Sequence, residues 1–102
     1  MKARLLVSGK VQGVGFRMRT QKEAAKLGLK GLVRNTPTGR VEVFCEGEKE
    51  KIQGLVQELR KPHRSWPLPE SDPHEVKVFF KGEKGFSPVW KGFQGFEIDF
   101  GH

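Results

Sequence analysis

The chain has 102 residues and a formal net charge of +7, which fits one basic domain built around a single hydrophobic core. Its one cysteine, Cys45, excludes an internal disulfide and leaves too few thiols for a cysteine-rich zinc site. No apolar stretch is long enough to cross a membrane, and the first residues lack the apolar core of a signal peptide. We therefore expect a cytoplasmic protein whose single domain spans residues 1–102.

The positive charge is concentrated in the N-terminal part of the chain. Residues 1–41 contain ten lysines and arginines but only one acidic residue, Glu23, whereas acidic residues slightly outnumber basic ones in the remainder. A segment of this kind attracts anionic ligands. Three of its lysines, Lys22, Lys26 and Lys30, are better explained as part of a solvated helix face.

Hydrophobic periodicity predicts five strands and two helices. The strands cover residues 3–8, 29–35, 40–46, 76–81 and 96–100, and the helices cover residues 17–27 and 48–60. Gly28 is a suitable C-terminal cap for the first helix. The sequence Thr-Pro-Thr-Gly at 36–39 is typical of a hairpin turn between the second and third strands.

The order of these elements predicts the fold class. The first six elements follow the order strand-helix-strand-strand-helix-strand, which is that of the ferredoxin-like, split βαβ arrangement, and the strand at 96–100 closes the chain. We therefore predict an α+β sandwich in which an antiparallel sheet carries both helices on one face. A proline-rich loop at 61–73 and an aromatic, glycine-rich loop at 82–95 complete the chain, and their roles stay open.

The segment between the first strand and the first helix carries the clearest functional signal. Residues 9–17 read Gly-Lys-Val-Gln-Gly-Val-Gly-Phe-Arg. Gly13 and Gly15 allow backbone N–H groups to converge on an anion, and the start of the helix adds further N–H groups. Arg17 adds a fork of donors that matches phosphate oxygens. This chemistry predicts a phosphate-binding loop, although an ordinary strand-to-helix turn with an exposed arginine explains the segment equally well.

The same segment resembles the signature of the acylphosphatase family. A second block, residues 28–36 followed by 39–43, is similar to the second signature of that family, in the right order and at the right separation. The resemblance is close in the first half of the chain and holds only in outline in the second. It implies an enzyme that hydrolyses acyl phosphates to a carboxylate and inorganic phosphate, without a cofactor and without a metal.

The resemblance also assigns roles to individual residues. The substrate phosphate would lie in the loop formed by Gln12, Gly13, Val14, Gly15, Phe16 and Arg17, and Asn35 would position the attacking water. Gln12 and Phe16 would contribute backbone donors and loop shape. The histidines are given no catalytic role, because His63, His74 and His102 lie in loops or at the terminus.

Two other functions stay open. A basic ferredoxin-like domain could bind single-stranded RNA on its open sheet face, helped by the aromatic loop around Trp90. The third strand lacks the aromatic RNA-binding pattern and places Glu42 and Glu46 outward, so nucleic acid is the less favoured partner. A non-catalytic acylphosphatase-like domain, as at the start of hydrogenase-maturation carbamoyltransferases, is the second alternative, although the zinc-finger cysteines of that context are missing. We expect a monomer with no membrane partner.

Overall fold

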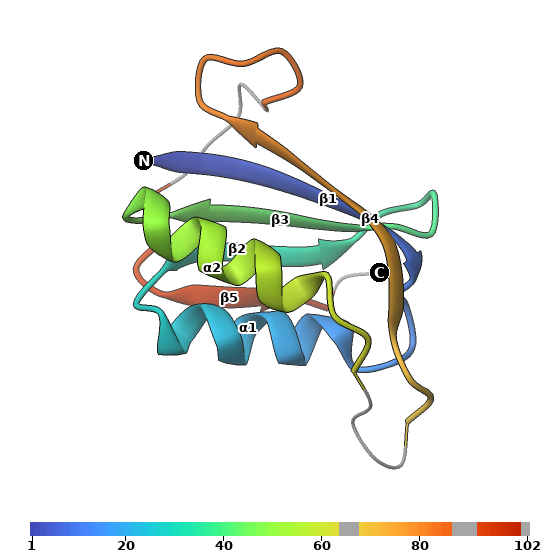
Figure 1. Ribbon diagram of the computed structural model, residues 1–102. Coiled ribbons are helices and arrows are strands. Elements are labelled where there is room, and N and C mark those ends of the chain that lie inside the picture. Colours follow the sequence, from blue (N-terminus) through green and yellow to red (C-terminus); the bar gives the residue numbers. More distant parts are fainter. Residues whose placement is uncertain (64–67, 87–91, 101–102) are drawn as a thin grey trace.

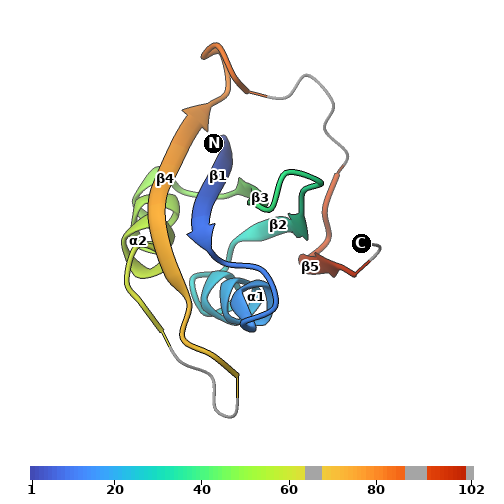
Figure 2. The same ribbon diagram turned by 90° about the vertical axis from the view of Figure 1, so that its right-hand side faces the viewer.

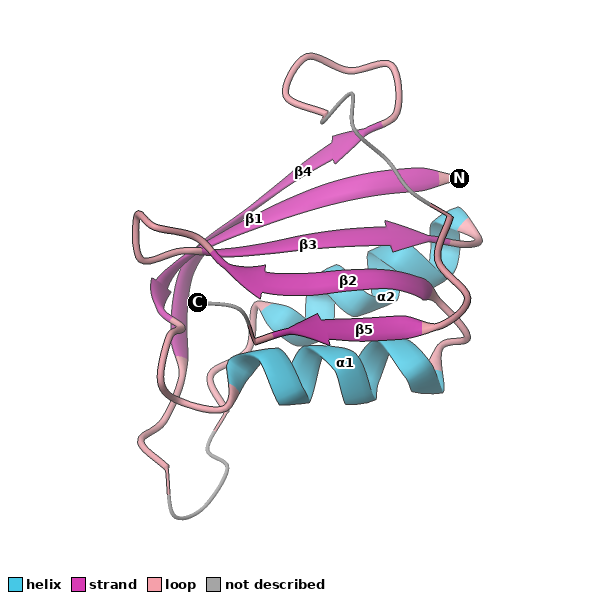
Figure 3. Cartoon of the chain, turned by 180° about the vertical axis from the view of Figure 1, so that it is seen from behind, coloured by secondary structure: helices cyan, strands magenta, loops and turns pink. Residues whose placement is uncertain are grey.

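The computed structural model describes residues 1–63, 68–86 and 92–100 (Figure 1). The elements in chain order are β1 (Lys2–Lys10), α1 (Phe16–Lys26), β2 (Lys30–Asn35), β3 (Val41–Glu46), α2 (Lys49–Leu59), β4 (Asp72–Phe80) and β5 (Phe96–Asp99). The strands form one sheet in the order β4-β1-β3-β2-β5, and both helices cover the same face of it (Figures 1 and 3). The predicted ferredoxin-like α+β sandwich is therefore confirmed.

The edge formed by β5 differs from the prediction. The pairs β1–β3, β1–β4 and β2–β3 are antiparallel, but β5 pairs parallel with β2, so the sheet is mixed. Because β1 and β2 are both antiparallel to β3, and β5 is parallel to β2, the strands β1, β2 and β5 run in the same direction. Their C-terminal ends consequently lie at one edge of the molecule, next to the start of α1 (Figure 1).

β4 begins earlier than the sequence pattern indicates. It starts at Asp72 and includes Pro73, which pairs with Gly9 next to an irregularity in the β1–β4 register. β4 is an edge strand, so a proline that lacks the N–H donor can face solvent there without the loss of a hydrogen bond between strands. Gly9 has a φ of 122°, and a Cβ there would lie 2.5 Å from the Asp72 carbonyl oxygen, so the close approach requires glycine.

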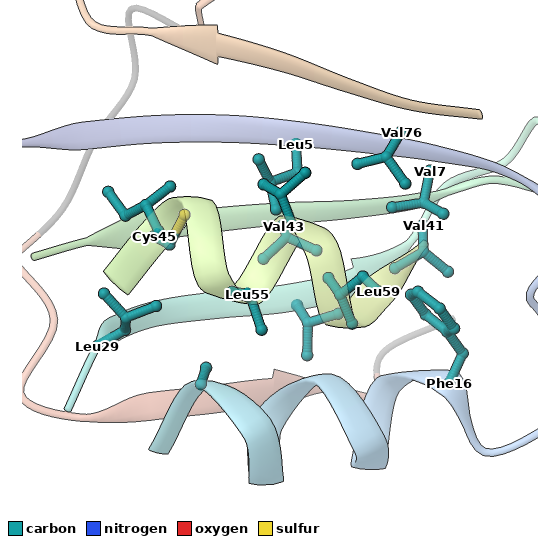
Figure 4. Packing of buried hydrophobic residues seen from close by; sticks show 14 of the residues in the cluster. Leu5, Val7, Phe16, Leu29, Val41, Val43, Cys45, Leu55, Leu59 and Val76 are labelled. Carbon is teal, nitrogen blue, oxygen red and sulfur yellow. The ribbon is translucent and has the colours of Figure 1, made fainter. Parts of the chain in front are cut away.

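The core lies between the sheet and the helices, as Figure 4 shows. The alternating residues of β1 and β3 and one stripe of α2 are fully or almost fully buried: Ala3, Leu5, Val7, Val41, Val43, Cys45, Ile52, Leu55, Val56 and Leu59. This burial confirms the alternation of β1 and the helical stripe of α2 expected from the sequence. The expectation that β3 has only one buried face was wrong, because Glu42 and Phe44 on its other face are buried as well. Burial raises the pKa of the Cys45 thiol to about 12, so this cysteine is a small core residue rather than a nucleophile.

The C-terminus of α1 has the predicted glycine cap. Gly28 takes a left-handed φ of 71° and donates from its N–H to the Ala25 carbonyl, while Leu29 donates to the Ala24 carbonyl. These two bonds form a Schellman motif. They end the helix and turn the chain directly into β2, which begins at Lys30.

Figure 2 views the sheet along its strands, with both helices on one side. The described parts of the segment between β4 and β5 lie on the opposite side. None of the helices in the described residues is both long and apolar enough to span a membrane.

Candidate active site

The loop between β1 and α1 takes a shape that depends on its two glycines. Gly13 and Gly15 both adopt left-handed backbone conformations, with φ values of 72° and 77°. A Cβ at Gly13 would meet nothing within 4 Å, so the dihedral angle rather than lack of space favours glycine there. Between and after them, Val14 and Phe16 are buried in the core and anchor the loop. The Phe16 side chain is thus part of the core, where it anchors the end of the loop.

The backbone N–H groups of this loop have no acceptors within the described part of the chain. In the part of the chain that the structure describes, no protein group accepts a hydrogen bond from the amides of residues 12–16. The N-cap of α1 is Gly15, which offers no side-chain cap, and the first turn of the helix holds no acidic residue. An N-terminus in this state presents free donors and a positive dipole end to an anion.

Arg17 lies on the first turn of α1 and is held by the end of β5. Its Nη1 donates to the Asp99 carbonyl oxygen at 2.8 Å, and its Cζ lies 5.2 Å from the centroid of the Phe100 ring. A guanidinium has five N–H donors, and among the described residues this is the only hydrogen bond from the Arg17 side chain. The half-buried guanidinium is thus fixed in orientation and retains donors for a ligand.

Asn35 ends β2 on the face that carries the helices. It pairs with Val41 of β3, and the alternation of the strand places it on the same side as the buried Val33. Its Oδ1 is the one buried side-chain oxygen or nitrogen without a hydrogen-bond partner among the residues described. Buried polar atoms almost always have a partner, so this acceptor calls for a donor that the described residues do not supply.

Two sets of contacts connect the loop to the surroundings of Asn35. The Gln12 side chain donates from Nε2 to the carbonyls of Thr36 and Arg40, at 3.0 and 2.8 Å. On the other side, the Arg17 partner Asp99 is paired with Arg34, the residue before Asn35. The loop is therefore attached on both sides of Asn35, and the two signatures meet at one edge of the sheet.

Sequence reasoning missed one wall of this site. Asp99 and Phe100, at the end of β5, contact Arg17 directly although more than 80 residues separate them in the chain. The available signal was the apolar alternation of the last strand, which predicts a strand but not its partner. The side-chain bonds of Gln12 to the hairpin were not expected either, because the sequence predicted only backbone donors and loop shape from this residue.

The histidines lie away from the loop. The backbone of His63 forms an isolated bridge with Ser71, and His74 belongs to β4, while His102 lies outside the described residues. No group of three or more potential metal ligands occurs among the residues that the structure describes.

On the face of the sheet opposite the helices, two arginines form ion pairs with one glutamate. Glu42 is only 6 % exposed and accepts hydrogen bonds from Arg4 Nε at 2.6 Å and from Arg34 Nε at 2.8 Å. Phe44, its neighbour in β3, is buried as well. Arg4 also donates to the Gly85 carbonyl in the segment after β4. The charged groups at the centre of this face are therefore satisfied within the protein.

Comparisons with known proteins point to one family. The sequence model of the acylphosphatase family matches residues 3–85. A relative named acylphosphatase from Pseudomonas paraeruginosa is 55% identical over 60 residues, which cover 58% of this chain and 66% of the relative. One from Thermococcus kodakarensis is 43% identical over 77 residues, which cover 76% of this chain and 81% of the relative.

Structural comparison extends the similarity over almost the whole chain. The crystal structure of an acylphosphatase from Bacillus subtilis has a TM-score of 0.76 and 33% identity, and covers 97% of this chain and 98% of that chain. The sequence match is shorter. It spans just under two thirds of the length of the Pseudomonas relative.

Proposed function

The chain belongs to the acylphosphatase family, and we propose that it hydrolyses the carboxyl–phosphate anhydride of acyl phosphates to a carboxylate and inorganic phosphate. The loop of residues 12–17 binds the phosphate, and Asn35 positions the attacking water. The observation that carries this proposal is the buried Oδ1 of Asn35, which has no hydrogen-bond partner among the described residues, near a loop whose amides have no acceptor among those residues either. Water is the donor that such an acceptor can take, and it is also the second substrate of a hydrolase.

The loop and Arg17 supply the charge that phosphoryl transfer requires. The transition state of this reaction is loose, and its charge is spread over three phosphoryl oxygens. The free amides of residues 13–16 and the remaining donors of Arg17 bind those oxygens. Because the Asp99 carbonyl fixes the guanidinium before substrate arrives, little reorganisation accompanies binding.

Asn35 acts on the nucleophile. Its Oδ1 accepts a hydrogen bond from the water and holds the water oxygen in line with the bond that breaks. The water oxygen bonds to phosphorus as the bond from phosphorus to the acyl oxygen breaks, and the electron pair leaves with the carboxylate. A phosphoryl oxygen takes the proton of the water. A carboxylate is a good leaving group, so this scheme needs no general acid, no metal and no cofactor.

A comparison of substrates tests the reaction class. Hydrolysis of benzoyl phosphate and of p-nitrophenyl phosphate is measured under the same conditions, with inorganic phosphate as competitor. We expect rapid cleavage of the anhydride, negligible cleavage of the ester, and competitive inhibition by phosphate. Equal cleavage of both substrates, or of neither, would contradict the proposal.

The nucleic-acid alternative receives little support from the structure. It needs an open, basic sheet face, but Arg4 and Arg34 are paired there with the buried Glu42. Trp90, the aromatic residue on which that alternative depends most, lies outside the described residues. The monomeric state and the cytoplasmic location stay predictions from the sequence. A non-catalytic acylphosphatase-like domain stays an alternative.

A further inference from the structure

An exposed aromatic ring lies beside the proposed phosphate site. Phe100 follows β5 directly, and 67% of the residue is exposed. The centroid of its ring lies 5.2 Å from the Cζ of Arg17. The hydrogen bond from Arg17 to the carbonyl of Asp99, the preceding residue, holds the ring next to the guanidinium.

The contact with Arg17 occupies only part of the ring. A cation–π contact at an exposed site contributes little stability, and most of the Phe100 surface still faces solvent. Single exposed apolar residues are common in proteins and need no function. What distinguishes Phe100 is its position against the group that is proposed to hold the substrate phosphate.

Met18 provides an internal comparison. It is 62% exposed and directly follows Arg17 in the sequence. It lines a different pocket, however, together with Gln21, Lys22 and His63. An exposed apolar side chain of similar size is thus available as a control that does not border the contact between Arg17 and Phe100.

The chemistry of the substrate brings its acyl group toward this ring. In an acyl phosphate, a single bridging oxygen separates phosphorus from the acyl carbon. When the phosphoryl oxygens bind the loop amides and Arg17, the acyl group cannot extend into the protein behind the loop, because Val14 and Phe16 fill that space. It must leave on the solvent side, where Phe100 borders the guanidinium.

We infer that Phe100 is a specificity-determining residue, whose ring packs against the acyl group and favours aromatic acyl phosphates over small ones. The inference rests on the proposed function. Contacts between aromatic rings correspond to a preference of roughly threefold to tenfold. An acetyl group is too small to cover the ring and gains little from it.

The test compares kcat/KM for benzoyl phosphate and acetyl phosphate in four proteins: the wild type, Phe100→Ala, Phe100→Leu and Met18→Ala. We expect Phe100→Ala to lower the benzoyl-to-acetyl ratio by roughly threefold to tenfold, mainly through the KM for benzoyl phosphate. Phe100→Leu should give an intermediate ratio, and Met18→Ala should keep the wild-type ratio. The inhibition constant of inorganic phosphate should stay within about twofold of the wild type in all four.

Two results would overturn the inference. An unchanged ratio in Phe100→Ala would show that the ring does not contact the acyl group. An equal loss with both substrates and with inorganic phosphate would show that Phe100 acts only through Arg17.

Binding of benzylphosphonate and methylphosphonate, measured by calorimetry, separates this inference from the proposed function. If the wild type hydrolyses neither acyl phosphate, the proposed function fails. The ratio of the two phosphonate affinities still tests Phe100, because binding requires no turnover. A loss of the preference for benzylphosphonate in Phe100→Ala supports the inference, and a retained preference overturns it.

Discussion

Replacing Asn35 by alanine should lower kcat strongly while leaving the free energy of unfolding almost unchanged. The Oδ1 of Asn35 is buried and makes no hydrogen bond to the described residues, so its removal deletes no interaction that holds the fold together. We therefore expect the free energy of unfolding to change by less than about 1 kcal/mol, below the roughly 1–3 kcal/mol that it costs to break a buried hydrogen bond and leave its partner unsatisfied. In catalysis the same atom holds the nucleophile. The loss of one positioned polar group lowers kcat by about 10²–10³, or about 2.7–4 kcal/mol.

The measurement combines urea denaturation with steady-state hydrolysis of benzoyl phosphate. Thr38→Ala is a matched control, because this exposed residue lies on the same hairpin as Asn35 and its side chain forms one hydrogen bond among the described residues, with Thr36. The control should keep its kcat, and both variants should be inhibited by inorganic phosphate as the wild type is. A wild-type kcat in Asn35→Ala would refute the assignment of the water. A large loss of stability would show that Oδ1 has a structural partner.

The other predictions concern the loop and its charge. Arg17→Ala should lower kcat/KM by about 10³ or more and also weaken competitive inhibition by phosphate, because the guanidinium binds both ground state and transition state; inhibition at the wild-type level would exclude this role. Gln12→Ala removes two hydrogen bonds to the carbonyls of Thr36 and Arg40, so it should destabilise the protein by about 1–2 kcal/mol in urea denaturation and raise KM more than it lowers kcat. A kcat loss as large as that of Asn35→Ala would contradict a purely positioning role. Incubation with EDTA should leave benzoyl phosphate hydrolysis unchanged, and activity lost in EDTA and restored by Mg²⁺ would disprove the metal-free scheme.

The sequence predicts the parts of the fold that depend on local periodicity. The buried alternation of β1 and the apolar stripe of α2 lie where the pattern places them, because one face of each element must be buried whatever its neighbours are. In β3 the pattern predicted one buried face, but Glu42 and Phe44 on the other face are buried as well. The Gly28 cap was also predictable, since a left-handed residue after a helix favours glycine strongly. Each of these features is decided within a few residues of chain.

Local periodicity does not determine which distant segments pair with each other. The pattern of β5 identifies a strand, but its alternation is equally compatible with parallel and antiparallel neighbours, and the structure places it parallel to β2. The early start of β4 at Asp72 has a similar origin, because the segment is polar and becomes a strand only through pairing with Gly9 and Lys10. Tertiary context decides both cases.

The direction of β5 explains why the candidate site could be predicted only in part. Both signatures lie in the first half of the chain, so the loop and Asn35 could be named from the sequence. Their orientation depends on the second half. Because β5 runs parallel to β2, its end reaches the same edge as Asn35 and brings the Asp99 carbonyl to Arg17. An antiparallel β5 would end at the opposite edge and leave the guanidinium without this support. The arginine of the first signature is thus oriented by the backbone of a strand that neither signature contains.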